Sequence, residues 1–164
     1  HSHWLAVDCG VLLQQVVADA RFERPQNVLQ LNLPAEAVWL QGDPRLLTSA
    51  LENIIRNALL HTAPGTSVDI DLSGRRGMVE IDIRAHGPGV PEHLLADLLQ
   101  PFVRSEQARE RSPDTLDSGH RGFGLGLAIA DRVIRHHRGT LQLSNHAGGG
   151  LLVAVRLPQG SADD

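Results

Sequence analysis

The chain has 164 residues, of which 41% are hydrophobic and 21% are charged, and its formal net charge is −4 with histidine neutral. This length suits one domain with a two-layer core, and the composition excludes disordered and fibrous proteins. A negative net charge gives no general attraction to nucleic acid or anionic lipid, so we expect no nucleic-acid partner. The one cysteine, Cys9, cannot form an intramolecular disulfide, and no apolar run approaches the roughly 20 residues that span a bilayer.

The first third of the chain predicts a helix and two short strands. Residues 1–9 are expected to be a linker or a remnant of an expression tag, and Asp8 is a candidate cap for an amphipathic helix over 10–21. Residues 28–33 alternate in polarity as a half-buried strand does. Residues 37–41 are expected to pair with them across the intervening turn.

The middle of the chain predicts a long helix and a hairpin. Asp43 and Pro44 provide a capping carboxylate and a proline at the first helical position, so a helix is expected from there to about His61. Residues 67–73 and 78–85 both alternate and are joined by Gly-Arg-Arg-Gly, which predicts a β-hairpin.

The last part of the chain predicts a loop, a helix and a second hairpin. A short helical stretch is expected to end near Phe102, followed by a long mobile polar loop over 104–121. Gly124 opens a helix expected to end near His137. Two strands, 140–145 and 151–157, then close the domain, which spans 10–160 and leaves 161–164 as a tail.

Strands and helices are mixed without strict alternation along the chain. This pattern predicts the α+β class: a two-layer α/β sandwich with about three helices on a mixed, mostly antiparallel sheet of about five strands.

Three polar side chains lie four residues apart on the predicted helix over 44–61. Asn53, Asn57 and His61 share one face of that helix, although asparagine is a poor residue for a helix interior. An amide oxygen is a suitable hard ligand for Mg²⁺, which would join it to phosphate oxygens. The alternative is a polar helix face that is simply solvated.

Two glycine-rich turns are candidate binding elements. Residues 122–127 (Gly-Phe-Gly-Leu-Gly-Leu) lead into a helix, where free amides could meet phosphate oxygens; the alternative is a plain loop-to-helix turn. The stretch matches neither the P-loop nor the dinucleotide fingerprint. Gly87-Pro88-Gly89 follows a predicted strand and, by itself, indicates only a tight turn.

Four runs occur in the order found in one family: residues 51–58 (LENIIRNA), 87–91 (GPGVP), 101–104 (PFVR) and 122–129 (GFGLGLAI). In this order they resemble the N, G1, F and G2 boxes of the catalytic domain of sensor histidine kinases. The stretch His-Arg-Gly-Thr at 137–140 and the three glycines at 148–150 resemble the closing hairpin of that domain.

The resemblance implies the nucleotide-binding α/β sandwich shared with gyrase-like ATPases, with ATP and Mg²⁺ as cofactors. Asn57 would hold Mg²⁺, Asn53 would lie near the phosphates, and residues from about 103 to 121 would form a lid. The further nucleotide-binding positions implied are His61, Ala85, Gly87, Gly89, Phe102, Arg104, Arg121, Gly122, Gly124, Leu125, Gly126 and Leu127.

The resemblance also implies partners. These are a histidine-containing dimerisation domain of the same protein and a cognate response regulator. The full-length protein would be a homodimer anchored in the bacterial inner membrane, with this part cytoplasmic and monomeric when isolated.

Three departures from the family leave its activity open. The phospho-accepting histidine motif is absent, Leu60 stands where a Lys or Arg is frequent, and Ala85 replaces the Asp that accepts a hydrogen bond from the adenine amino group. Ala85 indicates either a natural degenerate kinase or an engineered change. The alternative function is a regulatory domain of the same fold that binds nucleotide poorly. A gyrase-like ATPase is disfavoured, because Asn53 occupies the position of its general base.

Overall fold

The computed structural model describes residues 4–62, 65–95 and 121–160, and for residues 94 and 121–126 the backbone alone. The strands and helices, in chain order, are β1 (Leu5–Asp8), α1 (Cys9–Glu23), β2 (Val28–Asn32), β3 (Trp39–Gly42), α2 (Pro44–Leu60), β4 (Ser67–Arg75), β5 (Met78–Arg84), α3 (Glu92–Leu95), α6 (Arg121–His136), β6 (Thr140–Asn145) and β7 (Leu151–Pro158).

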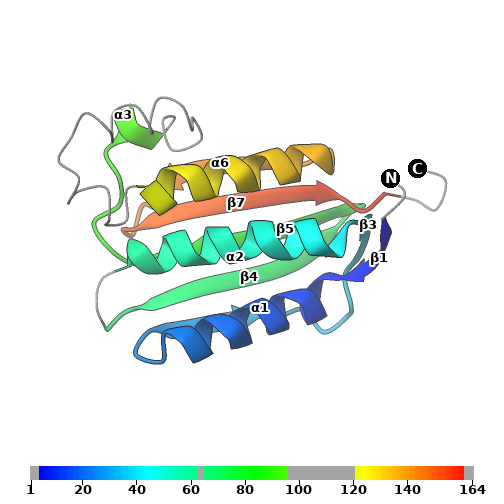
Figure 1. Cartoon of the computed structure of the whole chain (residues 1–164), viewed down its shortest axis with the longest axis horizontal. Helices are drawn as coiled ribbons and strands as arrows, with labels where there is room; N and C mark the ends of the chain where they lie inside the picture. Colours follow the sequence, from blue (N-terminus) through cyan, green and yellow to red (C-terminus); the bar gives the residue numbers. More distant parts are fainter. Residues whose placement is uncertain (1–3, 63–64, 96–120, 161–164) are drawn as a thin grey trace.

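The described residues form the predicted two-layer α+β sandwich. Five strands make a sheet in the order β2-β4-β5-β7-β6, in which β2 runs parallel to β4 and the other neighbours are antiparallel. The helices α1, α2 and α6 lie side by side on one face of this sheet, with α2 in the middle (Figure 1). A second, two-stranded sheet of β1 and β3 lies at the end of the molecule opposite α3 (Figure 1).

The core lies between the helices and the inner face of the sheet. Alternate residues of the central strands, such as Ile70, Ile81 and Ile83, are buried there against Ile54 of α2. Each such side chain contributes on the order of 1.5–3 kcal/mol by leaving water. Burial, with a further contribution from neighbouring Asp8, raises the pKa of the Cys9 thiol to about 12, so this cysteine is a core residue without thiolate character.

The caps predicted at Asp8 and Asp43 are confirmed. The carboxylate of Asp8 accepts a hydrogen bond from the amide of Val11 at 3.1 Å and begins α1. The carboxylate of Asp43 accepts from the amides of Arg45 and Leu46 at 3.0 and 3.3 Å. The two hairpins, β4–β5 and β6–β7, are confirmed as well.

Three expectations about local structure were wrong. Residues 5–8, within the expected linker, form β1, and β3 pairs antiparallel with β1 rather than with β2. Period-2 alternation identifies a strand but not its partner, and nearness in sequence wrongly favours the pairing of β2 with β3. Helix α6 begins at Arg121, three residues before Gly124, so the first glycines extend the helix.

Some expectations fall outside the described residues. These are most of the expected lid and the end of the short helix near Phe102. No helix in the described ranges is both long enough and apolar enough to cross a membrane.

Candidate nucleotide-binding site

Asn57 is a buried carboxamide on α2 that uses only part of its hydrogen-bonding capacity. Its side chain is 3% exposed, and its Nδ2 donates to the main-chain oxygen of Asn53 at 2.7 Å. Its Oδ1 is buried without a partner, and within the described residues only Asp131 Oδ1 shares that condition. An unpaired buried acceptor costs free energy, so this atom fits a ligand that supplies positive charge or a proton donor. An amide oxygen is a donor that Mg²⁺ accepts.

The other two polar positions of this helix follow from the same four-residue spacing. Asn53 is half-buried, and its Oδ1 accepts a hydrogen bond from Arg56 Nη1 at 3.2 Å. His61 is the C-terminal cap residue of α2 and is also half-buried. The structure therefore places both carboxamides on one side of α2 and leaves Asn57 as the more deeply buried of the two.

Ala85 follows directly after β5 and points into the core. Its side chain is fully buried, and its amide donates to the main-chain oxygen of Leu151 at 2.9 Å. Asp82 lies on the other face of the strand, where its carboxylate accepts from Arg156 at 2.8 Å. Residue 85 is therefore oriented inward, and Asp82 is directed away from it.

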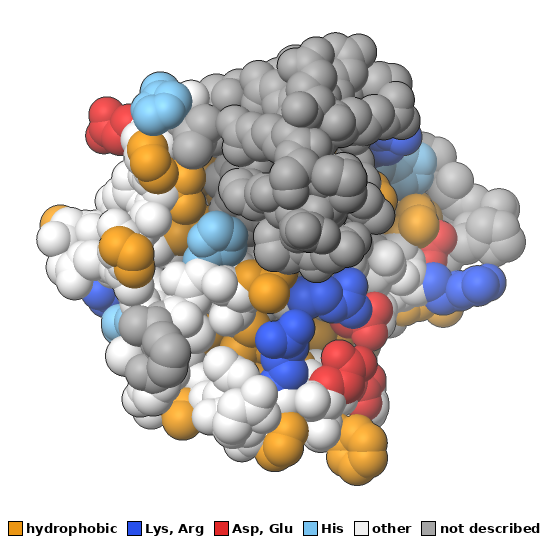
Figure 2. Space-filling model, turned by 60° about the vertical axis from the view of Figure 1, so that its left-hand side comes forward, with side chains coloured by type: hydrophobic (Ala, Val, Ile, Leu, Met, Phe, Trp, Pro, Cys, Tyr) orange, Lys and Arg blue, Asp and Glu red, His pale blue; other side chains and the backbone are white. Residues whose placement is uncertain are grey.

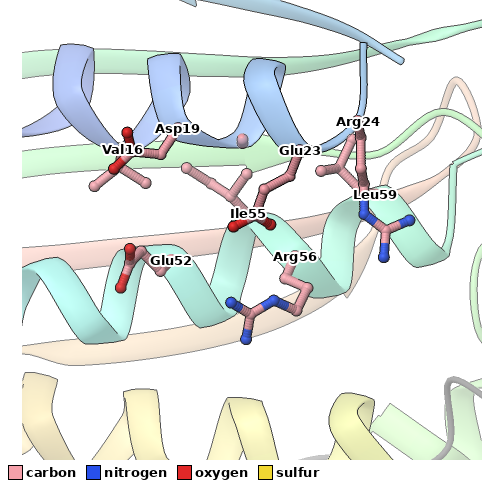
Figure 3. Close-up of a pocket in the computed structure, with 9 residues that line it drawn as sticks. Val16, Asp19, Glu23, Arg24, Glu52, Ile55, Arg56 and Leu59 are labelled. Atoms are coloured by element: carbon pink, nitrogen blue, oxygen red, sulfur yellow. The ribbon is translucent and has the colours of Figure 1, made fainter. Parts of the chain in front are cut away.

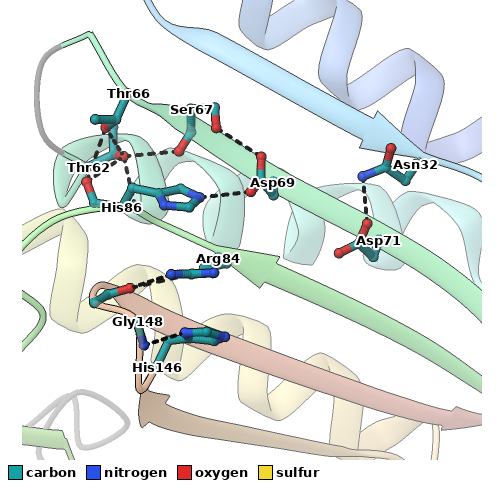
Figure 4. A network of polar contacts seen from close by, with 11 residues as sticks. Asn32, Thr62, Thr66, Ser67, Asp69, Asp71, Arg84, His86, His146 and Gly148 are labelled. Atoms are coloured by element: carbon teal, nitrogen blue, oxygen red, sulfur yellow. Dashed lines mark hydrogen bonds and ion pairs between the residues drawn. The ribbon is translucent and has the colours of Figure 1, made fainter.

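The backbone just before Gly87 is held by the end of α2. The amide of His86 donates to Thr62 Oγ1 at 3.0 Å, and its carbonyl oxygen lies 3.1 Å from the hydroxyls of Thr62 and Thr66 (Figure 4). The imidazole of His86 points away toward β4, where its Nε2 lies 2.8 Å from Asp69 Oδ2. The end of α2 and the glycine turn are thus in direct contact.

Asp69 has a pKa below its usual value. Partial burial alone would raise the pKa of this carboxyl, but hydrogen bonds from His86 and Ser67 and the nearby charge of Arg84 outweigh it. The contact between Asp69 and His86 fixes the His86 side chain on the side of the sheet remote from the helices.

The backbone just after Gly89 is held by the end of β6. Asn145 Oδ1 accepts from the amide of Val90 at 2.9 Å, and its Nδ2 donates to the carbonyl oxygen of Val90 at 2.6 Å. Gly89 has a φ of +82°, and a Cβ there would come within 2.6 Å of Asn145 Oδ1. This position therefore requires glycine both for its conformation and for space.

The start of α6 supplies the second glycine-rich element. Arg121, Gly122, Gly124, Leu125 and Gly126 lie in its first two turns, and α6 packs along α2, which carries Asn53 and Asn57. The side chain of Leu127 is fully buried in the core. Phe102 and Arg104 lie outside the described residues, so the structure leaves their predicted contacts untested.

A separate shallow pocket lies between α1 and α2. Figure 3 shows its lining, with an apolar floor and charged side chains at the rim. Of the residues that line this pocket, Arg56 contacts Asn53, but the pocket is on another side of α2 from Asn57.

On the surface at the end of the molecule where α2 terminates, basic and acidic side chains lie next to each other, and hydrophobic side chains are scattered (Figure 2).

Sequence reasoning missed the side chains that hold the glycine turn. Thr62 and Asn145 lie 24 and 55 residues from the backbone groups that they bind. No local spacing or periodicity marks such a pair, because each is an ordinary polar residue at the end of a helix or strand. Only the sheet order brings them to the turn.

Comparison with known proteins gives the family of the chain. Residues 42–161 match the family described as "Histidine kinase-, DNA gyrase B-, and HSP90-like ATPase". The chain is 35% identical over 152 residues to the probable sensor histidine kinase TcrY of Mycobacterium tuberculosis, covering 93% of this chain and 30% of that protein. It is 36% identical over 154 residues to the sensor histidine kinase CpxA of Escherichia coli, covering 93% of this chain and 32% of CpxA.

A solved structure extends the comparison to the fold. The ATP-binding domain of PrrB from Mycobacterium tuberculosis superimposes with a TM-score of 0.71 at 30% identity, covering 97% of this chain and 99% of that one. The chain spans about a third of the length of the curated relatives that it matches. It belongs to the histidine kinase-, DNA gyrase B- and HSP90-like ATPase family, as the ATP-binding catalytic domain of a sensor histidine kinase.

Proposed function

We propose that this domain binds Mg-ATP and positions it for transfer of the γ-phosphoryl group to a histidine on a dimerisation domain outside this chain. The observation that carries the proposal is the buried, unpartnered Oδ1 of Asn57 on the helix that also presents Asn53. Asn57 would hold the cation, and Asn53 would face the phosphates. The cation would neutralise phosphate charge when bound.

The transfer that we propose breaks the bond between the γ-phosphorus and the oxygen that bridges it to the β-phosphorus. ADP leaves with the electron pair of that bond, and a ring nitrogen of the acceptor histidine forms the new bond to phosphorus. Catalysis of this kind is mostly positioning and charge neutralisation. The free backbone amides in the first turn of α6, which begins at Arg121, would contribute by meeting phosphate oxygens.

Two positions of the proposed site lack the group that the family resemblance implies. Ala85 offers no carboxylate to the adenine amino group, and Leu60, which is 39% exposed, offers no charge to the phosphates. These two residues favour the second candidate function, a regulatory domain that binds nucleotide poorly. The intact carboxamides and glycines favour the first.

The proposal for the whole protein is inferred from what the names of its relatives say. TcrY and CpxA are sensor histidine kinases, so we infer a membrane-anchored homodimer in which this domain is cytoplasmic and serves a cognate response regulator. In that arrangement the isolated domain is expected to be monomeric.

Calorimetric titration of the purified chain with ATP, with and without Mg²⁺, tests the metal role of Asn57. We expect the parent chain to bind ATP more tightly with Mg²⁺ and Asn57→Ala to lose this difference. The melting temperature should change little, because the variant loses one hydrogen bond and also removes an unpaired buried oxygen. Asn32→Ala removes an exposed carboxamide bond to Asp71 and is the matched control. Unfolding of Asn57→Ala would instead assign the carboxamide a structural role.

A further inference from the structure

We propose that Thr62 and Asn145 are positioning residues that hold the turn around Gly87–Gly89 in the shape that receives the nucleotide. This proposal rests on the proposed function of the turn. Its basis is that each flank of the turn is bound by a side chain from a different, sequence-distant element: the end of α2 on one side and the end of β6 on the other.

On the first flank, hydroxyl groups satisfy both polar backbone groups of His86. Its amide donates to Thr62 Oγ1 at 3.0 Å, and its carbonyl oxygen is 3.1 Å from the hydroxyl of Thr62 and from that of Thr66 (Figure 4). Thr62 is nearer to α2 than Thr66 is, and its hydroxyl oxygen accepts the hydrogen bond from the His86 amide. Because it follows Asn57 by five residues, it connects the expected metal end of the site with the turn.

On the second flank, one carboxamide replaces a strand partner. Asn145 bonds both the amide and the carbonyl of Val90, at 2.9 and 2.6 Å, as a neighbouring backbone would. Val90 is 7% exposed, and the two bonds are partly buried, with Asn145 on the solvent side. The contact is close enough that residue 89 must lack a Cβ.

The two clamps leave little freedom to a turn that contains two glycines. Glycine loses the most conformational freedom on ordering, so an unheld turn would have to be ordered by the ligand. That ordering would weaken binding on the order of tenfold for each residue fixed. Since Ala85 supplies no carboxylate, the fixed backbone is the main contribution that this turn can make.

Two substitutions remove the clamps with little change in shape. We expect Thr62→Val and Asn145→Leu each to weaken Mg-ATP binding by roughly tenfold in calorimetry, while Thr62→Ser, which keeps the hydroxyl, retains parent affinity. Asn32→Leu makes the same substitution at a carboxamide that bonds Asp71 at 2.7 Å in another part of the sheet, and it should bind like the parent.

Amide hydrogen exchange separates positioning from general loss of structure. In both clamp variants the amides of His86, Gly87, Gly89 and Val90 should exchange faster, and those of β4 and β5 should keep their protection. Faster exchange throughout β4 and β5 would overturn the proposal, because the residues would then support the whole sheet. Parent-like ATP affinity in both variants would overturn it while leaving the proposed function intact. If the parent chain itself does not bind ATP, the proposed function fails and this inference fails with it.

Discussion

At the scale of single residues, the site is marked by side chains that break ordinary rules of burial. Buried polar atoms are nearly always paired, yet Asn57 Oδ1 is not. Asp131 Oδ1 is in the same condition, but the other oxygen of that carboxylate binds Arg135 at 3.0 Å. Departures of this kind are expected where a protein keeps capacity for a ligand.

We propose that position 85 sets the affinity for the base. We predict that Ala85→Asp tightens ATP binding by roughly ten- to over a hundredfold, since a hydrogen bond to a charged group contributes about 1.5–3 kcal/mol. Without ligand the variant should be less stable than the parent, because a carboxylate would be buried where the present side chain is fully covered. Calorimetry and thermal melts with and without ATP measure both effects.

GTP is the control for this prediction, because it presents a carbonyl oxygen where adenine presents an amino group. We expect Ala85→Asp to gain no affinity for GTP. Equal gains for ATP and GTP, or an unchanged ATP affinity, would show that position 85 does not contact the base.

At the scale of helices and strands, one buried histidine joins two helix ends remote from the glycine turn. His137 is 3% exposed; its Nε2 accepts from the amide of Asp43 at 3.0 Å, and its Nδ1 donates to the carbonyl of Val133 at 2.9 Å. Trp4 stacks on the imidazole with ring centroids 5.0 Å apart. The end of α6 is thereby tied to the start of α2, the two helices that carry the candidate site.

This contact predicts a pH-dependent loss of stability. Burial lowers the pKa of His137, and neighbouring His136 lowers it further against the opposing effects of Val133 and Asp43. Because the folded pKa lies below the unfolded one, the unfolded state binds more protons in the window between them. The contribution of His137 to the free energy of unfolding should therefore be fully present above about pH 6.5. Below that pH the free energy of unfolding should fall by up to about 1.4 kcal/mol per pH unit.

Urea unfolding at a series of pH values checks this. In His137→Gln, which cannot be protonated, the decline below pH 6.5 should be shallower than in the parent. His93→Gln, at an exposed histidine of α3, controls for the loss of one titrating side chain. The pKa of Asp69 is also lowered in the folded state, so its contribution to stability is likewise lost as the pH falls, but only below its ordinary value of 3.8, and it does not obscure the effect. Identical slopes for parent and His137→Gln would refute the role of His137.

The elements differ in how far the sequence specifies them. The caps at Asp8 and Asp43 are local signals, and the structure has them as predicted. The predicted Gly-Arg-Arg-Gly connection is also a local signal, but β4 extends through Arg75, so the turn itself is Arg76-Gly77, where both residues have positive φ. The parallel pairing of β2 with β4 and the β1–β3 sheet depend on contacts distant in sequence, which no local pattern encodes. Likewise, Asn53 and Asn57 are found by helical spacing, whereas Thr62 and Asn145 are not.

At the scale of the whole molecule, the candidate site occupies one end of the sandwich. The glycine turn after β5 and the last residues of α2 lie at the end near α3, and the β1–β3 sheet lies at the other (Figure 1). The chain spans about a third of its curated relatives, so the group that would receive the phosphoryl is expected on another part of the protein.

Because the phosphoryl acceptor is expected on another part of the protein, we predict that the isolated chain does not phosphorylate itself. None of its nine histidines lies in the family's acceptor motif, and His137, for example, is buried with both ring nitrogens hydrogen-bonded. Incubation with radiolabelled Mg-ATP should therefore leave no acid-labile label on the chain. Adding the dimerisation segment of the same protein should produce label on that segment alone, and Asn57→Ala should abolish it. Acid-labile label on the isolated chain would show that it carries its own acceptor, and the need for a separate acceptor domain would be wrong.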